Sequence, residues 1–550
     1  MISFLKRNYL IIIILIISVI LRLFKLADYP VGFHIDEASL GYNGYSLLVT
    51  GKDEHGNRFP LYIDMFGDNR PSGYHFLVIL PIYLFGLNEF ATRLPGALYG
   101  VISVLCIYIL SYTVFHHKKV ALVASFLTAI SPWSVNLSRA SSESIVALCF
   151  ITIGEAQIIR SLKSANITAL IVGSLIISIS FFYYHSPRIF VPVLFVVITI
   201  INFKSIINAT VKYKITILLS FVYVCLLAYT LIFSISGGTG RFNQVSIFNF
   251  PETRLVMEEQ FREDGTQKVN LLFTRILHNK PVNYLLTFLA NYFDYFTGQF
   301  MFVKGGLPIW YRIPNIGLLY LAELPFLVLG LFYLFFRKNI HSGIMISWLL
   351  ISPLVAAITS DDIPNIQRAI YMFPVLEMIT GYGLVMFLAN KSNSKKILII
   401  GIFSIAIIFN FIYFIHQYFI HGKSHQTLYR NNGFKEMVLT VKTEYDKNDI
   451  FVITKSLGGI YPLVLFFMKY DPFLYQAEGS NKDRDFKGFG KIIFTPQICP
   501  SNEELTRYLV HDRVVFVNNG TCDISEEEKI KIYREDGTLA FVIVYRNFKN

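Results

Sequence analysis

The sequence predicts a polytopic α-helical membrane protein with a small extracytoplasmic α/β domain at its C-terminal end. The 550 residues are 54% hydrophobic and only 16% charged, with a mean hydropathy of +0.50, which is typical of multi-span membrane proteins. Apolar runs recur as far as residue 420, and short β-branched runs then alternate with polar helical stretches. We therefore expect a membrane domain over 1–420 and an extracytoplasmic domain over 421–550.

The hydropathy pattern predicts about eleven transmembrane helices, if each needs roughly 20 residues. They lie near residues 8–27, 93–115, 119–135, 144–160, 166–184, 188–203, 214–235, 316–336, 341–358, 369–390 and 396–416. The first run follows Lys6 and Arg7, and no small-residue cleavage site comes after it. We interpret it as an uncleaved span rather than a signal peptide.

Charged residues divide between the predicted loops by sign, which predicts the orientation. One set of loops carries basic residues without acidic ones: Lys6, Arg7, Lys118, Lys119, Arg160, Lys163, Lys204, Lys212, Lys214, Arg337, Lys338, Lys391, Lys395 and Lys396. The opposite loops hold Asp36, Glu37, Asp53, Glu54, Glu143, Glu252, Asp361 and Asp362. By the positive-inside rule, the N-terminus is cytoplasmic, the number of spans is odd and the C-terminal domain is extracytoplasmic. The net charge of +12 thus reflects topology, and we expect no nucleic-acid partner.

Two large outer loops are predicted, over residues 28–92 and 236–315. Within the first, the apolar run 76–88 is too short to span and contains Pro81, so we expect an interfacial helix. Within the second, the run 281–303 is rich in aromatic residues and contains Asp294, which also favours the interface. The alternative is a twelfth span, which would reverse the orientation of everything after it.

The C-terminal region predicts a partly parallel sheet. Its β-branched runs are DIFVIT (449–454), KIIFT (491–495), RVVFVN (513–518) and AFVIVY (540–545). It has no Gly-rich phosphate loop after a strand. Cys499 and Cys522 could pair if the region is extracytoplasmic, but the sequence does not decide this. We expect this domain to serve acceptor binding or stability rather than catalysis.

Adjacent carboxylates, Asp36 and Glu37, follow the first predicted span by about ten residues and are the candidate catalytic residues. An enzyme with an outward-facing acidic loop has no nucleotide pool, so its activated donor must arrive in the membrane, as a polyprenyl-phosphate sugar does. In transfer from such a donor, a carboxylate takes the proton of the acceptor hydroxyl. Neighbours on a helix diverge by about 100°, so one of the two faces the substrate. The alternative is that Asp36 caps a helix.

Four arginines are candidates for binding the donor phosphate, because a guanidinium can contact phosphate through two donors. They are Arg70, Arg139, Arg188 and Arg368, each in an outer loop or at its junction with a span. The alternative for each is a position at the lipid headgroups.

No cofactor is specified by the sequence, although a divalent metal remains open. His34, His55 and His185 lie on the outer face without a second histidine close by. His421 and His425 form the one HxxxH pair, but their HGKSH setting favours a linker over a metal site.

The run HIDEASLGYNGYSLLVTGKDEHGNRFPLYIDMFGDNRPSGYHF, followed by LFGLNEFATRLPGALYGV, resembles the first outer loop of bacterial GT-C glycosyltransferases. It is most similar to the protein O-mannosyltransferase and lipid A aminoarabinose transferase group, which is glycosyltransferase family 39-like. The resemblance covers roughly the first 140 residues closely. It implies a lipid-linked sugar donor, inverting transfer and a catalytic Asp that maps onto Asp36. The family's basic-Pro motif, usually Lys-Pro, contacts the donor phosphate and is Arg70-Pro71 here.

The expected function is therefore that of an integral membrane glycosyltransferase in the cell envelope. It would transfer a hexosyl or pentosyl group from a polyprenyl-phosphate donor to a protein, lipid or glycan acceptor. Two other classes stay open. A lipid-linked glycan flippase or transporter would show two related halves and charged residues inside spans, for which Glu155, Glu323 and Glu377 are the candidates. A membrane sensor with an outer ligand domain would not need the loop that contains Asp36 and Arg70.

Overall fold

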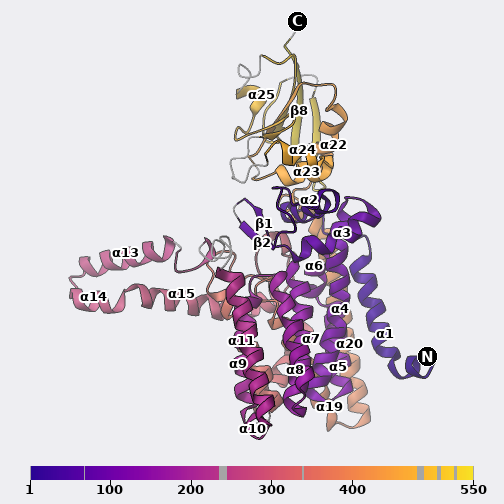
Figure 1. The fold of residues 1–550 in the computed structure, drawn as a ribbon, viewed down its shortest axis with the longest axis vertical. Helices are drawn as coiled ribbons and strands as arrows, with labels where there is room; N and C mark the ends of the chain where they lie inside the picture. Colours follow the sequence, from indigo (N-terminus) through magenta and orange to yellow (C-terminus); the bar gives the residue numbers. More distant parts are fainter. Residues whose placement is uncertain are drawn as a thin grey trace. The chain divides into compact units, whose positions relative to one another are not determined.

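The computed structural model describes residues 2–66, 68–233, 244–249, 251–336, 340–456, 458–479, 488–503, 510–525 and 529–548 (Figure 1). They form two compact units. The helical unit comprises Met1–Arg22, Gly96–Ser138 and Ser142–Ile415, and the loop-and-sheet unit comprises Leu23–Pro95, Arg139–Ser141 and His416–Asn550. The domain boundary expected at residue 420 is based on composition. The compact units differ from it, because Leu23–Pro95 belongs to the same unit as His416–Asn550.

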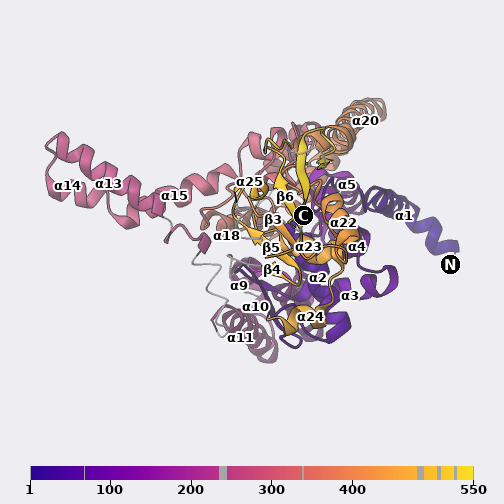
Figure 2. The same ribbon diagram turned by 90° about the horizontal axis from the view of Figure 1, so that it is seen from above.

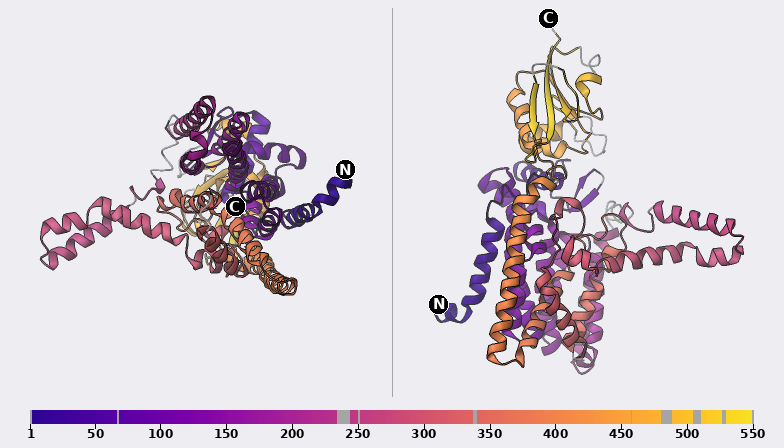
Figure 3. Two further views of the ribbon diagram at one scale, coloured as in Figure 1. Left: turned by 90° about the horizontal axis from the view of Figure 1, so that it is seen from below. Right: turned by 180° about the vertical axis from the view of Figure 1, so that it is seen from behind.

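A helix lies at each of the eleven predicted span positions. These helices are α1 (Ile2–Leu23), α4 (Glu89–Phe115), α5 (Lys118–Ile130) with α6 (Pro132–Arg139), α7 (Glu143–Ser164), α8 (Ile167–Ile179), α9 (Pro187–Ile201), α11 (Val211–Phe233), α16 (Leu324–Phe336), α17 (Ile340–Ile351), α19 (Met372–Ala389) and α20 (Asn393–His416). Within the helical unit, α7 packs along α8, and α19 packs against both α5 and α16. In the right-hand view of Figure 3, α20 is the long orange helix. Gly154 and Gly173 allow the first pair to approach closely, since a Cβ on Gly154 would lie 3.0 Å from the Gly173 carbonyl oxygen.

By length and composition, five helices in the described part of the chain can cross a membrane, and six can if a bent pair counts as one span. The bent pair is α5 and α6, which meet at 52°. Pro132 begins α6 and cannot continue the hydrogen-bond ladder of α5. The predicted helical membrane architecture is therefore confirmed, but the number of eleven spans stays a prediction. Arg337 and Lys338, two of the predicted cytoplasmic residues, lie outside the described residues.

The second predicted outer loop contains α13 (Pro251–Thr266), α14 (Leu271–Leu277) and α15 (Lys280–Asp294), and α13 runs beside α15 (Figure 2). Asn291 of α15 donates to the carbonyls of Ala357 and Thr359 at 3.2 and 2.9 Å. The segment 281–303 is not one helix, because α15 ends at Asp294 and a short π-helix follows at Gln299–Val303. Its location at the membrane interface stays a prediction.

The loop-and-sheet unit contains a six-stranded sheet of order β4-β5-β3-β6-β8-β7. The strands are β3 (Ile450–Thr454), β4 (Gly488–Phe489), β5 (Ile492–Thr495), β6 (Arg513–Asn519), β7 (Lys529–Tyr533) and β8 (Leu539–Asn547). β3 pairs in parallel with β5 and β6, and the other pairs are antiparallel. This confirms the predicted partly parallel sheet. Cys499 and Cys522 form a disulfide, which the sequence left open.

The same unit contains the first polar segment, with α2 (Ile35–Thr50), the hairpin β1 (Tyr62–Met65) and β2 (Asp68–Pro71), and α3 (Gly73–Phe85). Among the described residues of the C-terminal part, the helices are α21 (Gly422–His425), α22 (Phe434–Glu444), α23 (Tyr461–Met468), α24 (Pro472–Ala477) and α25 (Pro500–Glu503). α2 packs against α3 and α23. A Cβ on Gly41 would overlap the Phe466 ring, so only glycine allows α2 and α23 to approach this closely. The predicted catalytic loop therefore shares its core with the C-terminal residues.

Candidate functional site

The first turn of α2 carries the two adjacent carboxylates. His34 is the N-cap, and its side chain accepts a hydrogen bond from the Asp36 amide at 3.2 Å. Glu37 completes the cap, since its Oε2 accepts from the His34 amide at 3.2 Å. The alternative that Asp36 is the cap is wrong, because the cap is His34 and the helix begins at Ile35, two residues earlier than an Asp36 cap requires. The Asp36 side chain is thus not needed to cap the helix.

Asp36 forms an ion pair with Arg70, whose Nη1 lies 3.0 Å from Asp36 Oδ1. The β1–β2 hairpin places Arg70 opposite Ile63, and Asp68 Oδ2 orients the guanidinium through its Nε at 3.2 Å. The side chains of Asp36 and Arg70 are 22% and 23% exposed. This partial exposure leaves both groups accessible to a ligand.

Electrostatics keep Asp36 ionised. Burial acts to raise the pKa of Asp36, but the Arg70 guanidinium and then His34 outweigh it and hold the pKa well below its usual range. The His34 Nδ1 lies 3.5 Å from Asp36 Oδ2. Behind Arg70, His75 is buried, and burial together with the Arg70 charge lowers the pKa of His75 to about 3. His75 is therefore neutral at pH 7.

Glu37 points away from Asp36 into a buried cluster of two arginines. Arg93 Nε donates to Glu37 Oε1 at 2.8 Å, and Arg430 Nη2 pairs with Oε2. Ser141 Oγ donates to Oε1 at 3.2 Å. Burial acts to raise the pKa of Glu37, but Arg93 and Arg430 lower it below the ordinary value. Glu37 was the second catalytic candidate, and the structure surrounds it with protein donors.

Arg139 also belongs to the loop-and-sheet unit, but its guanidinium faces the main chain. Its Nη2 donates to the carbonyls of Phe24 at 2.8 Å and Tyr29 at 3.1 Å. The charge lies over the Tyr418 and Phe419 rings, at 5.6 Å from each centroid. Arg139 is fully buried, and these contacts favour a structural part for it over phosphate binding.

The remaining two predicted arginines lie in the helical unit. Arg188 Nη2 donates to the Phe181 carbonyl at 2.8 Å. Arg368 forms a bidentate pair with Asp361, at 2.7 and 3.0 Å. Within the described residues, Arg70 is thus the predicted arginine that the structure pairs with Asp36.

The described residues contain no group of three or more His, Cys, Asp or Glu side chains arranged to hold a metal ion. His55 instead contacts the Asp64 carbonyl at 3.0 Å. His421 and His425 follow one another on the short helices after α20, with ring centroids 6.5 Å apart. The interpretation of this HxxxH pair as a linker stays a prediction.

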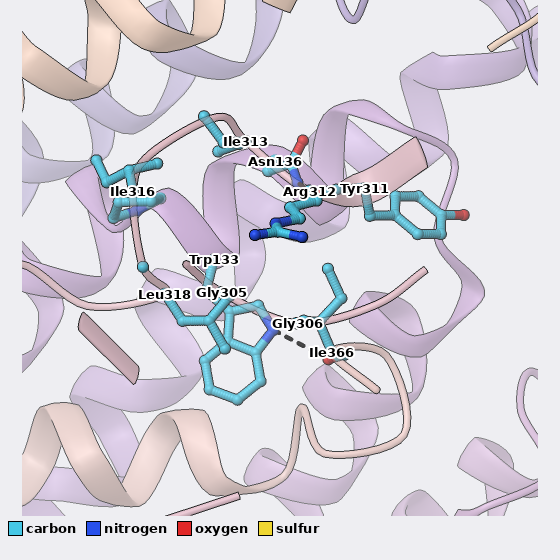
Figure 4. A pocket seen from close by; sticks show the side chains of 12 residues that line it. Trp133, Asn136, Gly305, Gly306, Tyr311, Arg312, Ile313, Ile316, Leu318 and Ile366 are labelled. Atoms are coloured by element: carbon cyan, nitrogen blue, oxygen red, sulfur yellow. Dashed lines mark hydrogen bonds between the residues drawn. The ribbon is translucent and has the colours of Figure 1, made fainter. Parts of the chain in front are cut away.

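The helical unit has a small pocket of its own, between α6 and the segments around residues 305–318 (Figure 4). The Trp133 indole forms one wall and donates to the Ile366 carbonyl at 3.0 Å. The Arg312 side chain lies across the pocket in Figure 4, and its Nε donates to the Lys304 carbonyl at 3.1 Å. No motif in the sequence predicted this pocket.

Two site residues escaped the sequence interpretation, Arg93 and Arg430. Arg93 lies inside the run FGLNEFATRLPGAL, so its place in that motif was an available signal. Arg430 lies 393 residues from Glu37 in the chain, and no local pattern links the two.

Comparisons with known proteins agree with this architecture. Residues 69–229 match the family model for dolichyl-phosphate-mannose-protein mannosyltransferase. Among solved structures, the chain is similar to ArnT from Cupriavidus metallidurans in its apo state, with a TM-score of 0.53 and 9% identity over 99% of this chain and 98% of that one. The complex of ArnT with undecaprenyl phosphate gives a TM-score of 0.52 and 9% identity, and covers 98% of each chain.

The oligosaccharyltransferase AglB from Archaeoglobus fulgidus, in complex with an inhibitory peptide and a dolichol-phosphate, gives a TM-score of 0.54 and 13% identity. That similarity covers 93% of this chain and 70% of AglB. No curated protein sequence matches the chain. The shared fold is that of polytopic GT-C membrane glycosyltransferases. The solved structures thus share the fold of this chain, and the family-model match is confined to residues 69–229.

Proposed function

We propose that this protein transfers a sugar from a polyprenyl-phosphate donor to an acceptor hydroxyl on the extracytoplasmic face of the membrane. Asp36 is the general base and Arg70 contacts the donor phosphate. The observation that carries the proposal is the partly exposed Asp36–Arg70 ion pair, because it sets a base beside a phosphate-binding group. The complexes of ArnT with undecaprenyl phosphate and of AglB with dolichol-phosphate support this class of donor.

The reaction needs only these two kinds of group. The acceptor oxygen attacks the anomeric carbon of the donor, and the bond from that carbon to the phosphate oxygen breaks. The electron pair leaves with the polyprenyl phosphate, and Asp36 takes the acceptor proton. Attack opposite the leaving phosphate inverts the configuration at the anomeric carbon. Arg70 stabilises the charge that grows on the phosphate oxygens.

The ion pair also suggests how the donor activates the base. Beside Arg70, Asp36 is a weak base, because the guanidinium holds its pKa down. A donor phosphate competes for the same guanidinium donors, and its negative charge raises the proton affinity of the nearby carboxylate. Donor binding therefore makes Asp36 a stronger base in the complex that reacts.

The test is transfer by the purified full-length protein in lipid nanodiscs. The donors are polyprenyl-phosphate mannose and polyprenyl-phosphate aminoarabinose, and released polyprenyl phosphate is measured in the presence of cell-envelope acceptors. Asp36→Asn should fold and bind donor but lose about 10²–10⁴-fold in turnover, the usual contribution of a general base. Because His34 caps α2, this substitution should leave the helix cap intact, and any loss of thermal stability should come from the ion pair with Arg70.

Asp28→Asn is the matched control, since Asp28 lies in the same polar segment and is exposed. It should transfer at the wild-type rate. Near-normal turnover in a folded Asp36→Asn protein would show that another group is the base.

A further inference from the structure

We propose that Arg430, a residue of the C-terminal region, is a positioning residue for catalysis: it holds Glu37 and thereby fixes the turn that carries Asp36. This inference rests on the proposed function, since it assigns Arg430 a part in the same transfer reaction. Arg430 follows the last predicted span by 14 residues, counting from residue 416, and no motif associates it with the outer loop.

The guanidinium of Arg430 contacts both sides of the α2 N-terminus. Its Nη2 pairs with Glu37 Oε2, and its Nε donates to the Val31 carbonyl at 3.2 Å. Val31 lies in the turn before the helix, and Glu37 lies in the first helical turn. One side chain therefore joins the entry of α2 to its first turn.

Arg93 completes the cluster from the opposite direction. Its Nη1 donates to the Leu26 and Ala27 carbonyls at 3.1 and 2.9 Å, and its Nη2 donates to the Gly32 carbonyl at 2.6 Å. Arg93 and Arg430 are fully buried, and Glu37 is 1% exposed. Two guanidiniums thus share one carboxylate, and main-chain carbonyls of residues 26–32 accept further hydrogen bonds from both.

The main chain of Arg430 reinforces this contact. Gly32 has a φ of +74°, and a Cβ at this position would overlap the Arg430 carbonyl oxygen. The turn before α2 is therefore packed directly against the backbone of the C-terminal segment as well as against the Arg430 side chain.

The position of Asp36 depends on this cluster because Asp36 and Glu37 are neighbours in one turn. The Glu37 carboxylate also accepts from the His34 amide, and His34 contacts Asp36 through its ring. If Arg430 is lost, Glu37 and the Val31 carbonyl each lose a buried partner, and the first turn is free to shift. A shift of about 1 Å is enough to cost roughly 10²-fold in rate when a reacting group is misplaced.

A second ion pair joins the same two stretches of chain and provides the control. Lys435 Nζ lies 2.6 Å from Glu89 Oε1, but the Lys435 side chain is 49% exposed. An exposed pair of this kind contributes little, and neither residue contacts the turn before α2 in the contacts above.

The experiment measures kcat and the donor KM for full-length Arg430→Gln, Lys435→Gln, Asp36→Asn and wild type in nanodiscs, on the folded fraction. Arg430→Gln should lower kcat by about 10²-fold with little change in donor KM, and Lys435→Gln should match wild type. The double variant Glu37→Gln/Arg430→Gln should lose no more than the worse single variant, because both remove one interaction.

Arg430→Lys keeps the charge but offers a single point of contact instead of a fork, so it should restore part of kcat. This variant also serves if Arg430→Gln does not fold. Wild-type kcat in folded Arg430→Gln or Arg430→Lys, with Asp36→Asn inactive, would overturn this inference alone. An active Asp36→Asn protein would instead mean that the proposed function itself is wrong.

Discussion

Asp36 and Glu37 are neighbours in the sequence but lie in different environments, because successive helical residues diverge by about 100°. Asp36 faces Arg70 and is partly exposed, whereas Glu37 is buried between Arg93 and Arg430. The pKa of each carboxylate is below its ordinary value. Both therefore stay ionised at neutral pH, and only Asp36 is accessible to a substrate proton.

The first prediction concerns Arg70 and pH. Arg70 lowers the pKa of Asp36, so Arg70→Gln should raise that pKa. Because Asp36 acts in its ionised form, the acid limb of the kcat/KM profile should move to higher pH. Donor affinity should also fall by about 1.5–3 kcal/mol, the typical value of a hydrogen bond to a charged group.

The measurements are kcat/KM from pH 4 to pH 8 and equilibrium binding of polyprenyl phosphate. Arg58→Gln is the control, since Arg58 is an exposed arginine of the same polar segment. An acid limb that stays in place, with donor affinity unchanged, would place Arg70 outside the reaction.

At the scale of elements, the contact between α2 and α23 joins the first polar segment to the C-terminal part. Gly41 leaves room for the buried Phe466 ring, and a Cβ there would also lie 2.6 Å from Thr92 Oγ1. We predict that Gly41→Ala destabilises the protein by about 1–3 kcal/mol through overpacking. This loss should outweigh the gain in helix propensity, which is about 1 kcal/mol for Gly to Ala.

Thermal unfolding in detergent is the measurement, with Gly265→Ala as the matched control. Gly265 also lies in a helix, α13, but no atom lies within 4 Å of a Cβ added there. The thermal unfolding midpoint of Gly265→Ala should therefore stay the same or rise. An equally stable Gly41→Ala protein would contradict the close packing of α2 on α23.

Local patterns predicted the elements well. The β-branched runs became β3, β5, β6 and β8, because such strands need only a short apolar stretch between polar segments. The sequence assigned Asp36 and Arg70 to one outer loop, but it did not predict the ion pair between them. The sequence predicted a single span over 119–135, and the break at Pro132 was missed. His34 was missed as the N-cap because histidine is not among the preferred capping residues.

Contacts between distant segments could not be predicted in this way. Arg430, one of the two arginines that pair with Glu37, lies in the C-terminal region. From composition alone, that region is predicted to be a separate domain. Arg139 and Arg368 show the same limit. Arg139 donates to main-chain carbonyls and Arg368 pairs with Asp361, but the local sequence of an outer-loop arginine does not distinguish these contacts from binding to phosphate.

At the scale of the whole molecule, the loop charges predict a cytoplasmic N-terminus and an extracytoplasmic C-terminal sheet. Val510, which is 87% exposed, provides a site to test the predicted extracytoplasmic location of the C-terminal sheet. Val510→Cys should react with a membrane-impermeant maleimide on intact cells, because the impermeant reagent reaches only the outer face.

Lys118→Cys is the matched control, since Lys118 is exposed at the start of α5 in a predicted cytoplasmic loop. It should be labelled only after the membrane is opened, and the unsubstituted chain reports any background from Cys225. Labelling of Val510→Cys only in opened cells would reverse the predicted orientation.

The loop-and-sheet unit draws its residues from both ends of the chain, and this has a consequence for biosynthesis. Glu37 is translated 393 residues before Arg430, a delay of roughly 20–80 s at ordinary rates of about 5–20 residues per second. Throughout that interval the nascent outer loop lacks the partner that buries its carboxylate. A ribosome that stalls inside the intervening helices therefore releases a product without a completed loop, because the Glu37 cluster can close only when translation has passed residue 430.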